Sequence, residues 1–149
     1  MKIHSNAIIH PEAIIAKNVE IGPFTVIDKN VRIDEGNVIH NNVTITGNTT
    51  IAKNNVIFPN SVIGAEPQDL KYYGEQSKLI IGSDNTIRES VTINTGTEVG
   101  GGETLIGNNN LFMSCSHIAH DCIIEDSVLI ANGVLLGGHI KIEKHAKLM

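Results

Sequence analysis

Residues 3–63 read IHSNAIIHPEAIIAKNVEIGPFTVIDKNVRIDEGNVIHNNVTITGNTTIAKNNVIFPNSVI, and an isoleucine occupies every sixth position of this stretch. A helix with 3.6 residues per turn would spread these side chains over several faces. A plain strand would keep them on one face, but strands run for only a few residues before a turn is needed. The period of six therefore predicts a solenoid of hexapeptide repeats, each forming one short flat side and one corner.

The period extends beyond this stretch. It returns over residues 81–93 and again over residues 106–148, so that 22 positions follow it and 19 of them are isoleucine. With three repeats to a coil, 18 residues complete one turn of a triangular prism of parallel strands. We therefore predict a single all-β domain, a hexapeptide-repeat β-helix, over residues 1–149.

Two further positions of the repeat support this geometry. The fifth position is mostly small or β-branched, which suits an interior next to a corner. The fourth position is often asparagine, which tolerates the left-handed backbone region better than other non-glycine residues, so it predicts a corner. These asparagines are Asn6, Asn18, Asn30, Asn42, Asn48, Asn54 and Asn60.

Composition excludes several functional classes. The chain has no tryptophan and a formal charge of −5, without the basic stripe of a nucleic-acid-binding protein. Its two cysteines are too few for a disulfide framework. The first residues lack the apolar core of a signal peptide, and no segment reaches the length of a membrane span. A cytoplasmic protein is the expectation, and the flat faces of a β-helix favour association into a cyclic trimer.

The period is interrupted twice. About residues 65–80, both tyrosines and a proline occur in a segment outside the repeat, and about residues 97–104 a second segment carries the run Gly100–Gly102. Insertions on a rigid scaffold often carry function. In the first segment, Asp69 and Lys71 are spaced so that both can face the same side of an extended loop, either for binding or as ordinary solvated charges. We expect the second to be a mobile loop or a tight turn.

The densest polar cluster is SCSHIAHDC, residues 114–122. A coil of 18 residues places Gly138 over His120 and His139 over Asp121, so these residues and His117 should converge on one face. A histidine beside an aspartate is suited to general-base catalysis, and a glycine N–H can stabilise an oxyanion. Two other interpretations stay open: the histidines are ordinary exposed corner residues, or three histidines bind Zn²⁺.

The sequence also resembles a known family, the UDP-N-acetylglucosamine O-acyltransferases that begin lipid A biosynthesis. The residues that carry the resemblance are PQDLKYYGE (67–75), IRESVTINTGT (87–97), the Gly-rich loop, HIAHDC (117–122) and LLGGH (135–139). Hexapeptide repeats alone are shared by many proteins, whereas the combination of these motifs is specific.

This resemblance implies a left-handed parallel β-helix and a homotrimer with active sites between subunits. It implies that an (R)-3-hydroxyacyl group passes from acyl carrier protein to the 3-hydroxyl of UDP-N-acetylglucosamine, without a metal or other cofactor. By this analogy His120 is the general base, Asp121 orients it, and the N–H of Gly138 stabilises the oxyanion. Substrate contacts are assigned by the same analogy to Gln68, Asp69, Lys71, His117 and His139.

The chain departs from the family pattern in three places. Asn94–Thr95 lacks the basic or imidazole residue usual there, and Cys115–Ser116 replaces the usual Asn-Ala-type pair. The helical C-terminal domain of the family has no counterpart in these 149 residues. Beside the acyltransferase, two hypotheses therefore remain: a trimeric zinc enzyme of carbonic-anhydrase type, and an inactive truncated scaffold.

Overall fold

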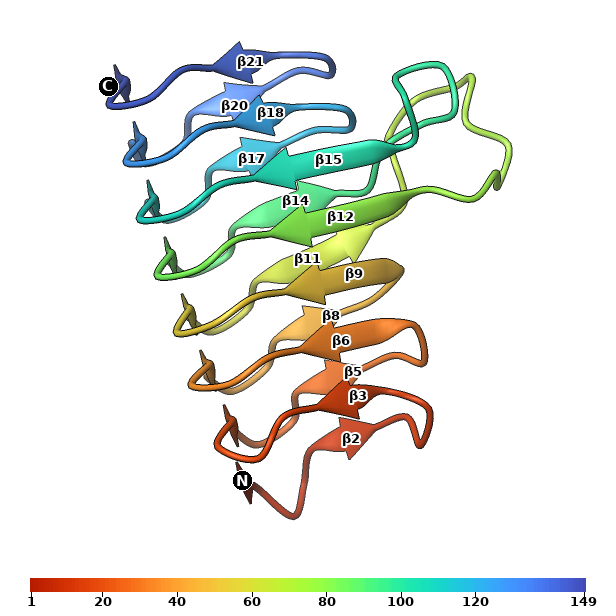
Figure 1. The fold of residues 1–149 in the computed structure, drawn as a ribbon, viewed down its shortest axis with the longest axis vertical. Coiled ribbons are helices and arrows are strands. Elements are labelled where there is room, and N and C mark those ends of the chain that lie inside the picture. Colours follow the sequence, from red (N-terminus) through yellow and green to blue (C-terminus); the bar gives the residue numbers. More distant parts are fainter.

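The computed structural model describes residues 1–149 and contains 22 strands and no helix. The strands form three parallel sheets that wind as the sides of a left-handed β-helix (Figure 1). The first sheet contains β1 (Lys2–Ile3), β4 (Glu20–Ile21), β7 (Val38–Ile39), β10 (Val56–Ile57), β13 (Thr86–Ile87), β16 (Leu111–Phe112), β19 (Leu129–Ile130) and β22 (Lys147–Leu148).

The other two sheets contain seven strands each. The second sheet is β2 (Ile8–Ile9), β5 (Val26–Ile27), β8 (Thr44–Ile45), β11 (Val62–Ala65), β14 (Thr92–Asn94), β17 (His117–Ile118) and β20 (Leu135–Leu136). The third sheet is β3 (Ile14–Ile15), β6 (Val31–Ile33), β9 (Asn48–Ile51), β12 (Lys78–Ile81), β15 (Glu103–Ile106), β18 (Ile123–Ile124) and β21 (Lys141–Ile142).

The register confirms the predicted coil of 18 residues. Ile9 pairs with Ile27 in the second sheet, and Ile118 pairs with Leu136 in the same way further along the chain. First-position side chains such as Ile45 and Ile63 stack inside the prism and are fully buried. Fifth-position residues complete this interior, so the predicted fold class is confirmed.

One corner of the prism is lined by a ladder of buried asparagines at the fifth position. The Oδ1 atom of Asn37 accepts a hydrogen bond from the N–H of Asn55, and Asn55, Asn85 and Asn110 repeat the pattern to the N–H of Val128. The side-chain amide of Asn55 donates to the carbonyl of Gly82. Because buried backbone groups need partners, the ladder stabilises a corner where a hydrophobic side chain would leave them unpaired.

The fourth position adopts the left-handed conformation at most corners, although the residue is not always asparagine. Asn42, Asn54 and Asn60 have φ values of 55°, 60° and 66°. The same conformation is adopted at Phe24, Gly36, Asp84, Ser90, Asn109, Cys115, Asp121, Ser127, Gly133, His139 and His145. Asn6, Asn18 and Asn30 lie in turns, as predicted, but without a positive φ. The predicted corner is wrong for Asn48, which lies in β9 because the preceding Gly47 takes the left-handed turn instead. Asp121 and His139 thus occupy equivalent corner positions of successive coils.

Both predicted excursions leave the same edge of the prism, between the second and third sheets (Figure 1). The first comprises residues 66–77, between β11 and β12, and the second comprises residues 95–102, between β14 and β15. Pairing resumes in the third sheet with Lys78 opposite Asn48 and Glu103 opposite Lys78. The insertions therefore extend outward without disturbing the stack. The structure contains no helix of the length and hydropathy required to cross a membrane.

Candidate active site

His120 and Asp121 lie in the turn between β17 and β18, on the edge that carries the excursions. The Nδ1 atom of His120 is 2.7 Å from the Oδ2 atom of Asp121, and the two residues are 9% and 7% exposed. The ionised carboxylate accepts this hydrogen bond, so Nδ1 carries the proton and Nε2 is left with a free lone pair. That arrangement gives His120 the tautomer of a general base.

Asp121 is held by hydrogen bonds from the second excursion. The hydroxyl of Thr97 donates to Oδ2 at 2.6 Å, and the backbone N–H of Thr97 donates to Oδ1 at 2.7 Å. The N–H of Asp121 donates to the hydroxyl of Thr104 in β15 at 2.9 Å. Burial raises the pKa of the Asp121 carboxyl, but the hydrogen bonds from Thr97 and His120 outweigh it and keep that pKa below the ordinary value. The carboxylate is therefore charged at neutral pH.

The next coil places Gly138 and His139 against this pair, as the 18-residue period predicts. A Cβ atom on Gly138 would lie 2.3 Å from Cε1 of His120, so no larger residue fits without moving the imidazole. The N–H of Gly138 has no hydrogen-bond partner within the chain. The ring of His139 meets that of His120 edge-on, with centroids 5.0 Å apart.

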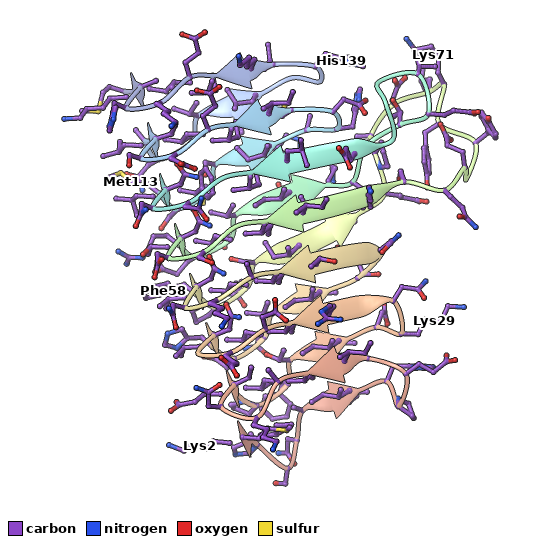
Figure 2. All side chains as sticks on the ribbon, in the orientation of Figure 1. Lys2, Lys29, Phe58, Lys71, Met113 and His139 are labelled. Atoms are coloured by element: carbon purple, nitrogen blue, oxygen red, sulfur yellow. The ribbon has the colours of Figure 1, made fainter.

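The first excursion brings Asp69 to the opposite side of His120. Its Oδ2 atom is 3.8 Å from Nε2 of His120, and its Oδ1 atom accepts a hydrogen bond from the N–H of Lys71. A cleft of about 490 Å³ opens between the excursion and the coils. It is lined by Gln68, Asp69, Leu70, Lys71, His120, Gly138 and His139. Lys71 and His139 lie on this edge in Figure 2.

The two excursions are attached to each other. The hydroxyl of Tyr73 donates to the carboxylate of Glu98, and the N–H of Glu98 donates to Oε2 of Glu75 at 3.2 Å. Hydrogen bonding to Glu98 raises the pKa of Tyr73, so the phenol keeps its proton. The loop that carries Asp69 is thus braced by the loop that holds Asp121.

His117 does not line the cleft. It lies on β17, and its Nδ1 atom is 2.6 Å from the hydroxyl of Thr92 in β14. Burial lowers the pKa of this imidazole, which favours its neutral form. The remaining predicted residues (His120, Asp121, Gly138, Gln68, Asp69, Lys71 and His139) are brought together.

The two sequence departures from the family pattern each leave a buried polar atom unpaired. Oδ1 of Asn94 and Oγ of Ser116 have no hydrogen-bond partner. Both residues flank the site, Asn94 at the end of β14 and Ser116 just before β17. Unpaired buried groups are rare and costly, so these two positions contribute less to stability than paired ones.

Residues His120, Asp121 and His139 could in principle hold a metal ion, since one donor atom from each lies within 4.8 Å of the others. However, Nδ1 of His120 already bonds to Asp121, and both oxygens of Asp121 accept hydrogen bonds from Thr97. A cation bound by Asp121 would have to replace these bonds. The donor set therefore fits a hydrogen-bonded acid–base pair better than a zinc site.

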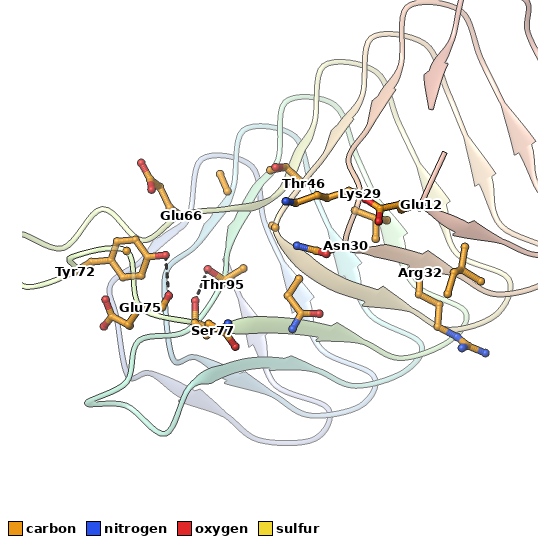
Figure 3. Close-up of a pocket in the computed structure, with 18 residues that line it drawn as sticks. Glu12, Lys29, Asn30, Arg32, Thr46, Glu66, Tyr72, Glu75, Ser77 and Thr95 are labelled. Atoms are coloured by element: carbon orange, nitrogen blue, oxygen red, sulfur yellow. Dashed lines mark hydrogen bonds between the residues drawn. The ribbon is translucent and has the colours of Figure 1, made fainter. Parts of the chain in front are cut away.

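A larger cavity, of about 940 Å³, lies on the other side of the first excursion (Figure 3). None of the residues that line the cleft beside His120 lines this cavity. Its wall includes Ser77, whose hydroxyl donates to Thr95, and Tyr72, whose hydroxyl donates to the carbonyl of Glu75. The lining also includes Lys29, Arg32, Glu12 and Glu66, a mixture of charges that selects no single class of ligand.

Thr97, Gly100 and Thr104 hold Asp121 but were not singled out from the sequence. Gly100 lies against the carboxylate, where an added Cβ would be 2.0 Å from Cγ of Asp121. For Thr97 and Gly100 the sequence signal is their position in the second excursion, whose glycine run predicts a loop or tight turn, whereas Thr104 lies in β15, just after it. The contact of this turn with Asp121 depends on how successive coils stack, which the sequence of the turn alone does not show.

Comparison with known proteins agrees with the fold. Residues 3–99 match the family model described as the GMPPB C-terminal domain, and residues 103–138 match the bacterial transferase hexapeptide model of six repeats. The first match includes the first excursion, and the second lies within the array of repeats.

Individual relatives are more specific. An acyl-[acyl-carrier-protein]--UDP-N-acetylglucosamine O-acyltransferase from Synechocystis is 57% identical over 60% of the chain, a match that covers 32% of that protein. A crystal structure of UDP-N-acetylglucosamine acyltransferase superposes with a TM-score of 0.98 at 54% identity, over 99% of this chain and 57% of that one. The structure of LpxA from Acinetobacter baumannii superposes with a TM-score of 0.96 at 45% identity, over 97% of this chain and 56% of that one. The chain thus spans little more than half the length of these solved relatives. The match to the curated relative covers about a third of that protein's length.

Proposed function

The chain belongs to the family of UDP-N-acetylglucosamine O-acyltransferases, and we propose that it carries the catalytic centre for transfer of an (R)-3-hydroxyacyl group from acyl carrier protein to the 3-hydroxyl of UDP-N-acetylglucosamine. The single observation that supports this most is the His120–Asp121 pair, with its free Nε2 facing a cleft whose far wall carries Asp69. The same reaction is the first step of lipid A biosynthesis, and the relatives' names supply the two substrates.

In the proposed mechanism, the sugar hydroxyl lies between Asp69 and Nε2 of His120. Nε2 accepts the hydroxyl proton while the oxygen attacks the thioester carbon of the acyl donor. Asp121 stabilises the imidazolium that forms, because its carboxylate faces Nδ1–H at 2.7 Å. The proton then passes to the departing thiol as the carbon–sulfur bond breaks, so the imidazole is regenerated.

The backbone N–H of Gly138 is assigned the role of stabilising the oxyanion that forms at the thioester carbonyl. Its N–H is unpaired within the chain and adjoins the imidazole, so a carbonyl oxygen beside His120 can reach it. Gln68 and Lys71 line the same cleft and are assigned contacts to the acyl-sugar, and His139 contributes the remaining polar wall. His117, next to Thr92, is assigned a place at the margin of the substrate site, outside the cleft.

An acyl-transfer assay tests this function and separates it from the two alternatives. Protein purified without chelators is mixed with (R)-3-hydroxyacyl carrier proteins of several chain lengths and UDP-N-acetylglucosamine, before and after treatment with EDTA. We expect acylated sugar nucleotide in both samples, because no step requires a metal. Stoichiometric zinc in the protein purified without chelators, together with no acyl transfer, would favour the metalloenzyme, whose zinc would have to be held by His120, Asp121 and His139. A folded protein that contains no zinc and gives no turnover with any of the acyl donors would favour the inactive scaffold.

We also propose a homotrimer, in a cytoplasmic protein that needs no nucleic acid or membrane partner. The outward side chains of the second sheet include Ile8 and Leu135, which are 66% and 70% exposed. Apolar residues on a flat face favour association. Sedimentation should give three times the chain mass of 16.1 kDa; a monomer at micromolar concentration would contradict this.

A further inference from the structure

The second excursion encloses the carboxylate of Asp121. Thr97 reaches both oxygens, with its hydroxyl on Oδ2 and its backbone N–H on Oδ1. Thr97 is itself 3% exposed, so neither bond competes with solvent. Hydrogen bonds to a buried charged group are stronger than neutral ones, and each oxygen of Asp121 is used.

The same threonine is fixed by its own loop. The N–H of Gly100 donates to Oγ1 of Thr97 at 3.2 Å, and the N–H of Gly102 donates to the carbonyl of Thr97 at 2.7 Å. The hydroxyl of Thr97 therefore accepts from Gly100, so its own proton must point to Asp121. Gly100 closes the enclosure because only a residue without a side chain can approach the carboxylate so closely.

The orientation of Asp121 decides what His120 can do. Oδ2 is shared by the Thr97 hydroxyl and His120 Nδ1, at 2.6 and 2.7 Å. Rotation of the carboxylate away from this plane would break the bond to Nδ1, and the imidazole would lose the partner that keeps Nε2 free. Thr97 does not line the cleft, so it does not contact the reacting atoms there.

We propose that Thr97 is a positioning residue for the reaction, and that its hydroxyl, fixed by Gly100, locks Asp121 in the orientation that makes His120 a base. This inference rests on the proposed function for its catalytic consequence only. The enclosure of Asp121 exists whatever the substrate, so it has a test that needs no acyl transfer.

The test compares Thr97→Val with Thr97→Ser. Valine has nearly the same shape and keeps the backbone N–H, so it removes only the hydroxyl, whereas serine restores it. In carbon-13 NMR, we expect the pKa of the Asp121 carboxyl to rise in Thr97→Val and to return toward the native value in Thr97→Ser. In the acyl-transfer assay, kcat should fall about 10- to 100-fold in Thr97→Val with KM little changed, because transition-state stabilisation is lost without a substrate contact.

Thr46→Val is the matched control. Thr46 also donates its hydroxyl to a carboxylate, that of Asp28 at 2.5 Å, on the same edge but below the excursions. Turnover and the Asp121 titration should be unchanged in this variant. An Asp121 pKa that is the same in Thr97→Val as in the native protein would overturn the inference. If the titration shifts but native protein transfers no acyl group, the proposed function fails while the inference stands.

Discussion

Replacing His120 with alanine is expected to lower kcat for acyl transfer by about 10²- to 10⁴-fold, the range for loss of a general base. Nε2 of His120 is the basic nitrogen that faces the cleft with a free lone pair, and the Oδ2 atom of Asp69 lies 3.8 Å away. The alanine variant therefore lacks the group that removes the sugar hydroxyl proton in the proposed mechanism. The measurement is the initial rate at saturating substrate concentrations, with circular dichroism to verify the fold.

Two other histidines provide the comparison. His10→Ala removes an exposed histidine from a lower corner of the same edge and should leave kcat unchanged. His139→Ala should cost less than His120→Ala, because His139 is half exposed and its Nε2 atom lies 3.7 Å from Asp121 rather than within hydrogen-bond distance. A larger loss in His139→Ala than in His120→Ala would transfer the role of base to His139.

The fold could be predicted almost completely from the sequence, because each coil repeats the same local problem. Ile27, Ile45 and Ile63 fill equivalent places inside the prism, so one period determines the pairing of every strand. The prediction of Gly138 above His120 followed from the same arithmetic. The structure adds that a left-handed corner conformation, rather than asparagine itself, recurs at the fourth position.

The excursions could be located from the sequence but their contacts could not. Nothing in the period places Asp69 beside His120 or Thr97 against Asp121, since those contacts cross 51 and 24 positions of the chain through loops outside the repeat. His117 shows the opposite limit. Its spacing from His120 suggested one cluster, yet the two residues lie on a strand and at a corner and so face different surroundings. Sequence periodicity positions strands, whereas loop packing decides which polar atoms meet.

Asp121→Asn is expected to lower kcat by a similar factor, about 10²- to 10⁴-fold, although it changes one atom. All the hydrogen bonds at this side chain point toward it: from the Thr97 hydroxyl, the Thr97 N–H and Nδ1–H of His120. The N–H of Thr97 can only donate, so an asparagine must place its oxygen there. Its NH₂ group then faces the Thr97 hydroxyl and His120.

The NH₂ group can only donate, so His120 must accept through Nδ1. The proton moves to Nε2, which is the atom that has to act as base. Nitrogen-15 NMR of the imidazole should therefore show the opposite tautomer in Asp121→Asn, together with the loss of turnover; an unchanged tautomer with full activity would remove Asp121 from the mechanism.

The pH dependence of stability gives an independent measurement of the role of Asp121, with a defined sign. Because the pKa of Asp121 lies below the ordinary 3.8, its carboxylate stabilises the native protein above that pH. The difference in unfolding free energy between native protein and Asp121→Asn should thus be present at neutral pH and disappear as the pH falls through the lowered pKa.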